Sequence, residues 1–345
     1  MLPATPIVFA QAMATTALLT ATAMLDCNPS LFWFDKWSAL SERFRSYNKS
    51  GRRTIWIIGA SSGIGQELAC QMADPNVAVD DATATETQEQ LHLIISSRNH
   101  SKLEQLALDL ENPRCRVTTL PLDVTSNAEI EAAVETLQTS RIVLDTVVLN
   151  AGFGHLTPAM ETLPTTAEAV FRGNALWPMV LLPLLAGNSA GLFRNEPHIV
   201  ATASVASYIP VPLSSTYCAA KHALLGYFRS LQAEEPSFCI QLVSPGPVET
   251  DFHQNHKQGR TTTSTNNKPS RLKMPVQRCA RLLLRAIQHR RSGEYWIATQ
   301  PLLTLLYMNN WFPGLVRFLT GRVGPKRVDL WRRGKDLYDP QSWRE

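Results

Sequence analysis

The sequence lacks the cysteine patterns that bind metals or form a disulfide framework. Six cysteines are spread over 345 residues, with no Cys-x-x-Cys motif and no grouping with histidine. This spacing disfavours structural zinc, a disulfide-stapled scaffold and a c-type haem. We therefore expect reduced structural cysteines and no metal site, and the redox compartment stays open.

Charged residues are also scarce. They make up 18% of the chain against 44% hydrophobic residues, a balance that is typical of a folded globule and excludes a disordered or fibrous chain. The net charge of +4 is too small to indicate nucleic-acid binding, and no groove-reading motif is present. Nucleic acid is therefore not an expected partner.

The amino-terminal residues 6–25 contain no charged side chain. The segment is long enough to span about 30 Å of hydrocarbon as a helix, although alanine and threonine make it only mildly apolar. Three interpretations of the segment remain: a membrane anchor, a cleaved signal peptide and an amphipathic flap. We favour the anchor. The first basic residues, Lys36, Arg43, Arg45 and Lys49, follow the segment, which favours a cytosolic catalytic domain. We assign residues 1–30 to the anchor or signal segment and 31–52 to a linker.

From residue 53 onward, short apolar runs alternate with segments of helical periodicity. Strands are predicted at 54–59, 91–97, 115–124, 144–152, 198–204 and 238–246, and helices at 63–73, 101–111, 127–137, 165–186 and 215–234. This alternation is typical of a doubly wound parallel α/β sheet. We predict one Rossmann-like domain over residues 53–293 and a carboxyl-terminal extension over 294–345.

A glycine-rich turn joins the first predicted strand to the first predicted helix. Its residues are Gly59, Ala60, Ser61, Ser62, Gly63, Ile64 and Gly65. Glycine permits a tight turn and close approach of the backbone to a pyrophosphate, and the positive end of the helix dipole favours that negative charge. The turn predicts a dinucleotide site, with a glycine-rich turn that binds no ligand as the alternative.

Residues at two later strand ends bear on the choice of dinucleotide. The second strand ends in Ser97 and Arg98, where an NAD enzyme carries an acidic residue for the ribose 2′-hydroxyl. Arginine suits a 2′-phosphate instead, so we predict NADP(H), with an exposed surface arginine as the alternative. Asp123, followed by Val124, is expected to meet the adenine edge or to cap the next helix.

Tyr217 and Lys221 are four residues apart, so they share one face of the predicted helix. An ammonium beside a phenol favours the phenolate and makes tyrosine a usable acid/base near neutrality. Ser204 ends the strand before this helix, and its hydroxyl is expected near the same substrate carbonyl oxygen. A Tyr-x-x-x-Lys pair alone also occurs on solvated helix faces.

Taken together, these motifs resemble the short-chain dehydrogenase/reductase family in order and spacing over roughly residues 53–255. The resemblance rests on the glycine-rich turn, Leu-Asn-Ala-Gly at 149–152, Asn174, Ser204, Tyr-Cys-Ala-Ala-Lys at 217–221 and Ser-Pro-Gly-Pro-Val-Glu-Thr at 244–250. It implies that Tyr217 transfers the carbonyl proton and that Lys221 binds ribose and lowers the tyrosine pKa. It further implies that Ser204 holds the substrate oxygen and that Asn174 positions a water in a proton relay.

The resemblance also implies the cofactor contacts. The turn residues Gly59, Ser62, Gly63, Ile64 and Gly65 would line the pyrophosphate, Asn150 would secure the cofactor-binding strand, and Val248 and Thr250 would approach the carboxamide. Within the family, segments 217–228 and 323–336 resemble the membrane-associated dehydrogenase/reductase member 7 branch. That branch is similar to enzymes that act on steroids, retinoids and other lipophilic carbonyls. Ile58, Leu149 and Trp177 depart from the frequent family residues without removing a catalytic group.

The carboxyl-terminal residues 294–319 are aromatic and apolar. Asn309, Asn310, Pro313 and Arg317 interrupt them, which argues against a membrane span. A basic cluster follows, formed by Arg322, Lys326, Arg327, Arg332, Arg333 and Lys335. We keep two interpretations: a flap that closes the substrate pocket, and contact with an anionic membrane surface.

The sequence therefore predicts an NADP(H)-dependent oxidoreductase that interconverts a lipophilic ketone or aldehyde and its alcohol. We expect it at a membrane, that of the endoplasmic reticulum, with the catalytic domain in the cytosol. The expected partners are a lipophilic small molecule and the membrane surface, and a homodimer is left open. A non-catalytic dinucleotide-binding protein on the same fold and a structural membrane scaffold are the alternatives.

Overall fold

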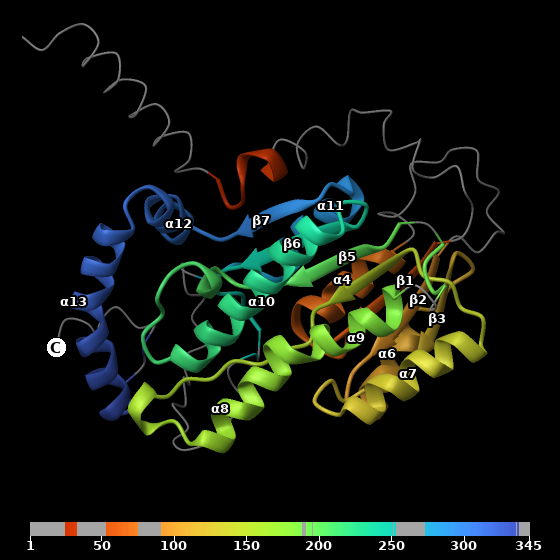
Figure 1. Cartoon of the computed structure of the whole chain (residues 1–345), viewed down its shortest axis with the longest axis horizontal. Coiled ribbons are helices and arrows are strands. Elements are labelled where there is room, and N and C mark those ends of the chain that lie inside the picture. The colour runs from red at the N-terminus through yellow and green to blue at the C-terminus, as the bar shows by residue number, and fades with distance from the viewer. Residues whose placement is uncertain are drawn as a thin grey trace, which may run out of the picture.

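A seven-stranded parallel sheet forms the centre of the protein (Figure 1). The computed structural model describes residues 25–32, 53–74, 91–187, 191–194, 196–250, 252, 273–335 and 337. The strands are β1 (Arg53–Ile58), β2 (Leu91–Ser96), β3 (Cys115–Thr119), β4 (Thr146–Leu149), β5 (His198–Thr202), β6 (Cys239–Pro245) and β7 (Gly293–Ile297). Their order, β3-β2-β1-β4-β5-β6-β7, confirms the predicted doubly wound fold.

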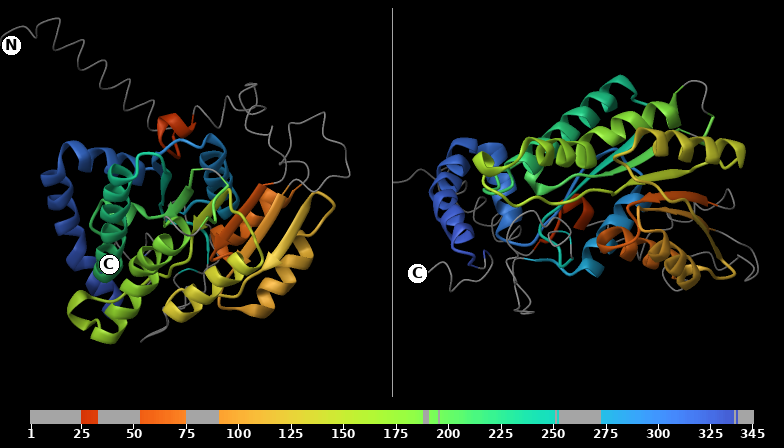
Figure 2. Two further views of the ribbon diagram at one scale, coloured as in Figure 1. Left: turned by 45° about the vertical axis from the view of Figure 1, so that its right-hand side comes forward. Right: turned by 90° about the horizontal axis from the view of Figure 1, so that it is seen from below.

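Helices cover both faces of this sheet (Figure 2). One face is covered by α4 (Gly63–Ala73), α6 (His100–Leu110) and α11 (Val276–His289), and the other by α7 (Asn127–Thr139), α9 (Trp177–Ala186) and α10 (Ser215–Glu234). Because the centre of the sheet is covered on both faces, β1 is an almost continuous apolar run instead of an alternating one, and all of it after Arg53 is buried. The edge strand β3 is partly exposed.

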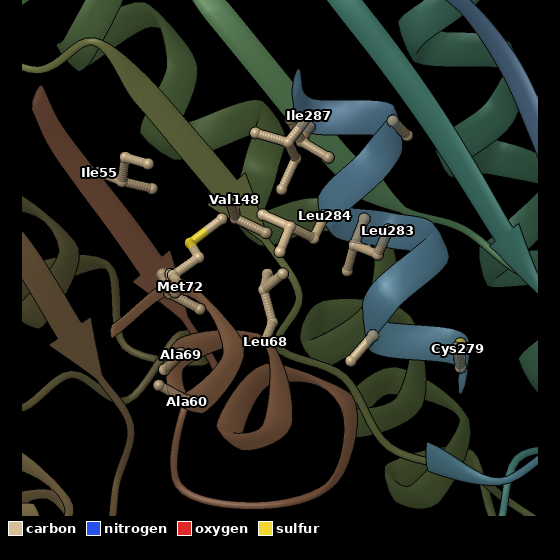
Figure 3. Close-up of a cluster of buried hydrophobic side chains, with 14 of the residues drawn as sticks. Ile55, Ala60, Leu68, Ala69, Met72, Val148, Cys279, Leu283, Leu284 and Ile287 are labelled. Carbon is tan, nitrogen blue, oxygen red and sulfur yellow. The ribbon is translucent and has the colours of Figure 1, made fainter. Parts of the chain in front are cut away.

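The packing of α4 against α11 fixes the helix that begins at the glycine-rich turn. Leu68 and Met72 of α4 and Leu284 and Ile287 of α11 meet around Val148 of β4 (Figure 3). Burial of each of these large side chains contributes about 1.5–3 kcal/mol to stability. The amino terminus of α4 is therefore held in one position relative to the sheet.

The folded body extends beyond the domain boundaries expected from the sequence. The expected end at residue 293 falls at the first residue of β7, which pairs in parallel with β6. At the same edge, residues 25–32 pack on β7: Cys27 forms an antiparallel bridge with Ile297, and Leu31 is buried. Residues 25–30, assigned to the anchor or signal segment, and residues 294–297, assigned to the extension, are thus part of this body. The rest of the expected anchor, residues 6–24, lies outside the described residues.

The helix predicted over 165–186 consists of three parts. These are α8 (Pro164–Phe171), the π-helical turn η2 (Arg172–Leu176) and α9. The stretch Pro164–Ala186 is long and apolar enough to cross a membrane by length and composition, and half of its apolar window is buried in the fold. Since Trp177, Leu181 and Leu185 pack into the core beside the sheet, we assign the stretch to the core.

Two helices after β7 cross the end of the sheet at which β5, β6 and β7 finish (Figures 1 and 2). They are α12 (Leu302–Trp311) and α13 (Pro313–Arg332). Leu306 and Val316 are buried against Ile209, which belongs to the loop between β5 and α10. This α12–α13 hairpin therefore covers the loop that precedes the predicted catalytic helix.

Candidate active site

The glycine-rich turn has no room for side chains at two positions. Gly59 has φ +93°, and a Cβ there would lie 2.7 Å from the Ala151 backbone. A Cβ on Gly65 would collide with the Gly59 carbonyl oxygen and lie 2.6 Å from Asn150 Nδ2. The first turn of α4 has no acidic residue and no side-chain hydrogen bond from its N-cap, Ser62. Its N–H groups and dipole are thus available to an anion, which fits a dinucleotide pyrophosphate.

A chain of hydrogen bonds links Lys221 to this turn. Lys221 Nζ donates to the Thr202 carbonyl oxygen at 2.9 Å, and Thr202 Oγ1 donates to Asn150 Oδ1 at 3.1 Å. Asn150 Nδ2 in turn donates to the Gly59 carbonyl oxygen at 3.0 Å. The predicted ribose-binding lysine and the predicted pyrophosphate turn are therefore fixed relative to each other through the ends of β1, β4 and β5.

Asn174 lies in the π-helical turn and is buried. Its Nδ2 donates to the carbonyl oxygens of Phe153 (3.0 Å) and Val170 (2.9 Å), and its Oδ1 accepts from the Phe153 N–H (3.1 Å). A Cβ on Gly152 would lie 2.7 Å from Asn174 Oδ1 and 3.7 Å from Lys221 Nζ. Asn174 and Lys221 thus converge on the loop after β4, and the Asn174 amide holds that loop in place.

Ser204 and Tyr217, predicted from the sequence as the reactive pair, lie close together in the structure. Ser204 caps the short helix η3 (Val205–Ser207), its Oγ accepting from the Ala206 N–H at 3.1 Å, and its hydroxyl is near enough to Tyr217 to lower the pKa of the phenol. Tyr217, in the first turn of α10, is partly exposed, and its ring meets Phe252 edge-to-face at a centroid distance of 5.9 Å. Two hydroxyls are thereby placed where one substrate oxygen can reach both.

Burial decides the pKa of both titratable groups in the site. Desolvation raises the pKa of Tyr217, and the hydrogen bond with Ser204 lowers it less than burial raises it. Desolvation also lowers the pKa of Lys221 from 10.5 to about 7. Lys221 Nζ lies 5.9 Å from the Tyr217 ring centroid. Burial therefore dominates both groups in the chain by itself, and a lowering of the tyrosine pKa by Lys221 stays a prediction.

The remaining predicted cofactor residues lie around the turn or at strand ends. Thr250 approaches Gly63, where an added Cβ would lie 3.3 Å from Thr250 Cγ2, and Val248 forms an isolated bridge with Met274. Ser61 and Ile64 are partly buried in the turn itself. Arg98 is exposed just beyond β2, and its side chain has no partner among the described residues. It is therefore free to meet an anionic group.

Asp123 and Val124 follow β3. Asp123 Oδ1 accepts from the N–H and the hydroxyl of Thr125 at 2.9 and 2.8 Å, whereas Ser126 is the N-cap of α7. The alternative in which Asp123 caps the helix is therefore wrong. Val124 packs against the core, and contact of Asp123 with adenine stays a prediction.

Sequence reasoning missed three contributors to this site. Thr202 carries the hydrogen-bond link, Gly152 leaves space for Asn174 and Lys221, and Phe252 supports the Tyr217 ring. Gly152 belongs to the Leu-Asn-Ala-Gly motif, which was a signal for it. Thr202 and Phe252 have no local signal, because only the sheet register and the loop path bring them to the site.

A cavity of about 700 Å³ lies beside the site, between the amino-terminal part of α10 and the α12–α13 hairpin. Its lining includes Tyr208, Val211, Cys218, His222 and Arg317. Ser204, Tyr217 and Lys221 do not line it among the described residues. The cavity is thus a neighbour of the reactive pair and not its immediate pocket.

Comparisons with known proteins agree with this geometry. The family model for short chain dehydrogenase matches residues 53–261. Dehydrogenase/reductase SDR family member 7 from Homo sapiens is 31% identical over 290 residues, covering 82% of this chain and 80% of that protein. Retinol dehydrogenase 8 from Homo sapiens is 33% identical over 205 residues, covering 58% of this chain and 60% of that protein.

Among solved structures, the alcohol dehydrogenase from the archaeon Thermococcus sibiricus complexed with 5-hydroxy-NADP has a TM-score of 0.58 and 22% identity. The match covers 72% of this chain and 97% of that one, and it shows the same fold. The sequence match to the family model includes the glycine-rich turn, Ser204, Tyr217 and Lys221. The chain therefore belongs to the short-chain dehydrogenase family of oxidoreductases.

Proposed function

We propose that the protein uses NADP(H) to interconvert a lipophilic ketone or aldehyde and its alcohol, with Tyr217 as the acid/base. The observation that carries the proposal is the convergence of Ser204 and Tyr217 beside a buried Lys221, 5.9 Å from the Tyr217 ring, that the sheet ends tie to the glycine-rich turn. A scaffold protein would not need these three groups in one place.

A bound nicotinamide supplies or accepts the hydride. Tyr217 donates its phenolic proton to the substrate oxygen in reduction and takes it back in oxidation, while the Ser204 hydroxyl hydrogen-bonds to the same oxygen. Lys221, with a pKa of about 7, exchanges protons near neutrality and is suited to reload Tyr217. Asn174 holds the loop at Phe153, and the relay water implied by the resemblance stays a prediction.

The choice of NADP(H) rests on Arg98. An exposed guanidinium just after β2, with no acidic residue next to it in the sequence, suits a 2′-phosphate and offers no acceptor to a ribose 2′-hydroxyl. The turn residues Gly59, Gly63 and Gly65 would hold the pyrophosphate. The complex of the Thermococcus sibiricus enzyme with an NADP analogue supports the same choice.

The lipophilic substrate is supported by the relatives and by the extension. Retinol dehydrogenase 8 is named for an apolar alcohol, and the cavity beside α10 is lined in part by Pro210, Val211, Pro212 and Pro313. Apolar linings of this kind favour apolar ligands. We propose that the physiological substrate is lipid-like and reaches the enzyme from a membrane.

We further propose a site at the endoplasmic reticulum membrane with the catalytic domain in the cytosol. Asn99 and Ser101 form a glycosylation sequon, and Asn99 caps α6 by accepting from the Lys102 N–H at 3.0 Å. A glycan there would break the cap beside Arg98. Protease protection of the domain in sealed microsomes, or a mass shift with endoglycosidase, would place it in the lumen.

The reaction is tested with Tyr217→Phe in a substrate screen by mass spectrometry. Removal of the phenol should lower kcat/KM by about 10²–10⁴-fold and leave NADPH affinity unchanged, since the ring and its contact with Phe252 remain. Tyr227→Phe, on the same helix, is the matched control and should keep full activity. If Tyr217→Phe retains more than about a tenth of the activity, Tyr217 is not the acid/base.

A further inference from the structure

Exposed apolar side chains gather on the α12–α13 hairpin. Among the described residues, the exposed large apolar side chains in this hairpin are Trp311, Phe312, Leu315, Phe318, Leu319 and Val323. The others, including Leu108 and Met160, are scattered over different elements. Single exposed apolar residues are ordinary, but a contiguous group of this size marks an interaction surface.

The group lies on the outward side of α13. Val316 is buried, and Gly324 faces the loop before α10, where an added Cβ would lie 3.6 Å from Pro212. On the opposite side of α13, exposed residues recur at helical spacing. They are Leu315, Phe318, Leu319, Arg322, Val323 and Lys326. We call these six residues the outer face of α13. A helix that packs inward by one side would ordinarily carry polar residues there.

The charge on the outer face has one sign. The guanidinium of Arg322 lies over the Phe318 ring, 4.4 Å from its centroid, and Lys326 follows one turn later. The sequence has no acidic residue from 312 to 328. Asp329, the next acidic residue, forms an ion pair with Arg333 at 3.0 Å. Apolar and aromatic side chains beside the exposed basic side chains of Arg322 and Lys326 complement an anionic lipid surface.

We propose that the outer face of α13, with Trp311 and Phe312 at the hairpin tip, docks on the surface of an anionic lipid bilayer. The inner side of the same helix contributes Arg317, Thr320 and Gly321 to the cavity beside α10. The two interpretations of the extension therefore belong to opposite sides of one helix: the inner side closes the cavity and the outer side meets lipid. The docked hairpin places the cavity wall at the boundary between lipid and water.

The test uses the full chain in lipid nanodiscs that carry brominated acyl chains, which quench nearby tryptophan. The quenching of Trp311 is obtained as the difference in quenched tryptophan fluorescence between the wild type and Trp311→Phe. In nanodiscs of phosphatidylcholine with phosphatidylserine, we expect bromolipid quenching of Trp311. Trp331→Phe, which removes a partly buried tryptophan of α13, is the control and should leave the quenching unchanged.

Two further variants locate the surface. Phe318→Glu with Leu319→Glu should abolish the quenching of Trp311, whereas the matched pair Leu108→Glu with Met160→Glu, 72% and 95% exposed on other elements, should keep it. The double variant Arg322→Gln with Lys326→Gln tests the charge. In this variant, the quenching of Trp311 should be the same in nanodiscs with and without phosphatidylserine. Circular dichroism checks that each variant is folded.

Three outcomes overturn the proposal. The first is an unquenched Trp311 in anionic nanodiscs, and the second is an equal loss of Trp311 quenching in both glutamate double variants. The third is cross-linking of Leu319→Cys to a second copy or to another segment of the same chain. The quenching does not require turnover, so its failure is distinguishable from failure of the proposed reaction.

Discussion

The glycine-rich turn and the α12–α13 hairpin are built in opposite ways. In the turn, Gly59 and Gly65 have backbone or amide atoms where a Cβ would stand. In the hairpin, an added Cβ on Gly314 or Gly321 meets nothing within 4 Å, and large apolar side chains lie exposed. The conformation of the turn is therefore determined by close atomic contacts, whereas the hairpin exposes an apolar surface to its surroundings.

This difference separates the proposed functions that need atoms in exact positions from those that need only a surface in contact with another. Reaction chemistry and dinucleotide binding depend on atoms fixed within a few tenths of an ångström, which the sheet ends provide. A surface that meets lipid or covers a cavity tolerates movement. Substitutions in the turn should therefore be costly, and substitutions on the hairpin should be mild for stability.

The largest expected effect is that of Gly65→Ala. The added Cβ would meet the Gly59 carbonyl oxygen and Asn150 Nδ2, so the turn must move, at a cost of about 3 kcal/mol. We expect a lower melting temperature and loss of NADPH binding, measured by calorimetry and fluorescence titration. Gly226→Ala, in α10 with open space around it, is the control and should stabilise the protein by roughly 0.5–1 kcal/mol. Similar losses in both variants would contradict the comparison.

Much of the fold could be predicted because apolar runs and helical spacing determine it locally. The helices at 63–73 and 215–234 have the predicted bounds. The helices after α10 and the strand β7 were missed, and α11 and β7 show why. The helix α11 carries three arginines among its apolar residues, and the short strand β7 runs directly into the apolar hairpin. Its place in the sheet follows from pairing with β6, which the local sequence does not contain.

The grouping of the candidate site residues could be predicted from the sequence, but their pKa values could not. Motif spacing predicted that Ser204, Tyr217 and Lys221 lie together, because residue types at fixed intervals carry that information, and the structure places them side by side. The direction of the Tyr217 pKa shift depends on burial, which the sequence does not report. The same holds for the π-helical turn at Asn174, whose extra residue per turn is set by packing against the loop at Phe153.

A second prediction concerns pH and the tightly built region. The unfolded chain holds the Lys221 proton up to pH 10.5, whereas the folded chain releases it near pH 7, so stability rises with pH in that window. The gain between pH 7 and 9 should be about 2 kcal/mol. Above pH 9, ionisation of groups such as Cys279, whose pKa is raised to about 12, acts in the opposite direction. Denaturant titrations should show a flatter pH dependence for Lys221→Met, and an unchanged slope would contradict a buried, desolvated Lys221.

A smaller effect is expected for Arg98→Ala, which tests the exposed rim of the dinucleotide region. Loss of one solvent-screened contact with a 2′-phosphate should weaken NADPH binding about tenfold and leave NADH binding unchanged. Arg116→Ala, an exposed arginine on the neighbouring strand β3, is the matched control. Fluorescence titration with both nucleotides measures the effect. Equal weakening of NADPH and NADH would show that Arg98 is only structural.

The smallest effect is expected where α13 meets the domain through an ion pair. Arg332 and Glu161 approach to 2.8 Å, but their side chains are 60% and 39% exposed, so the pair is screened by water. Arg278 and Asp26 are 25% and 30% exposed, and Arg278 donates to both carboxylate oxygens, at 2.8 and 3.1 Å. We expect Arg332→Ala to lower the free energy of unfolding by less than about 1 kcal/mol and Arg278→Ala by more, because the bidentate contact is better shielded. The reverse order in denaturant titrations would mean that the hairpin is clamped as tightly as the sheet edge, and the contrast between a surface region and a contact-determined one would then fail.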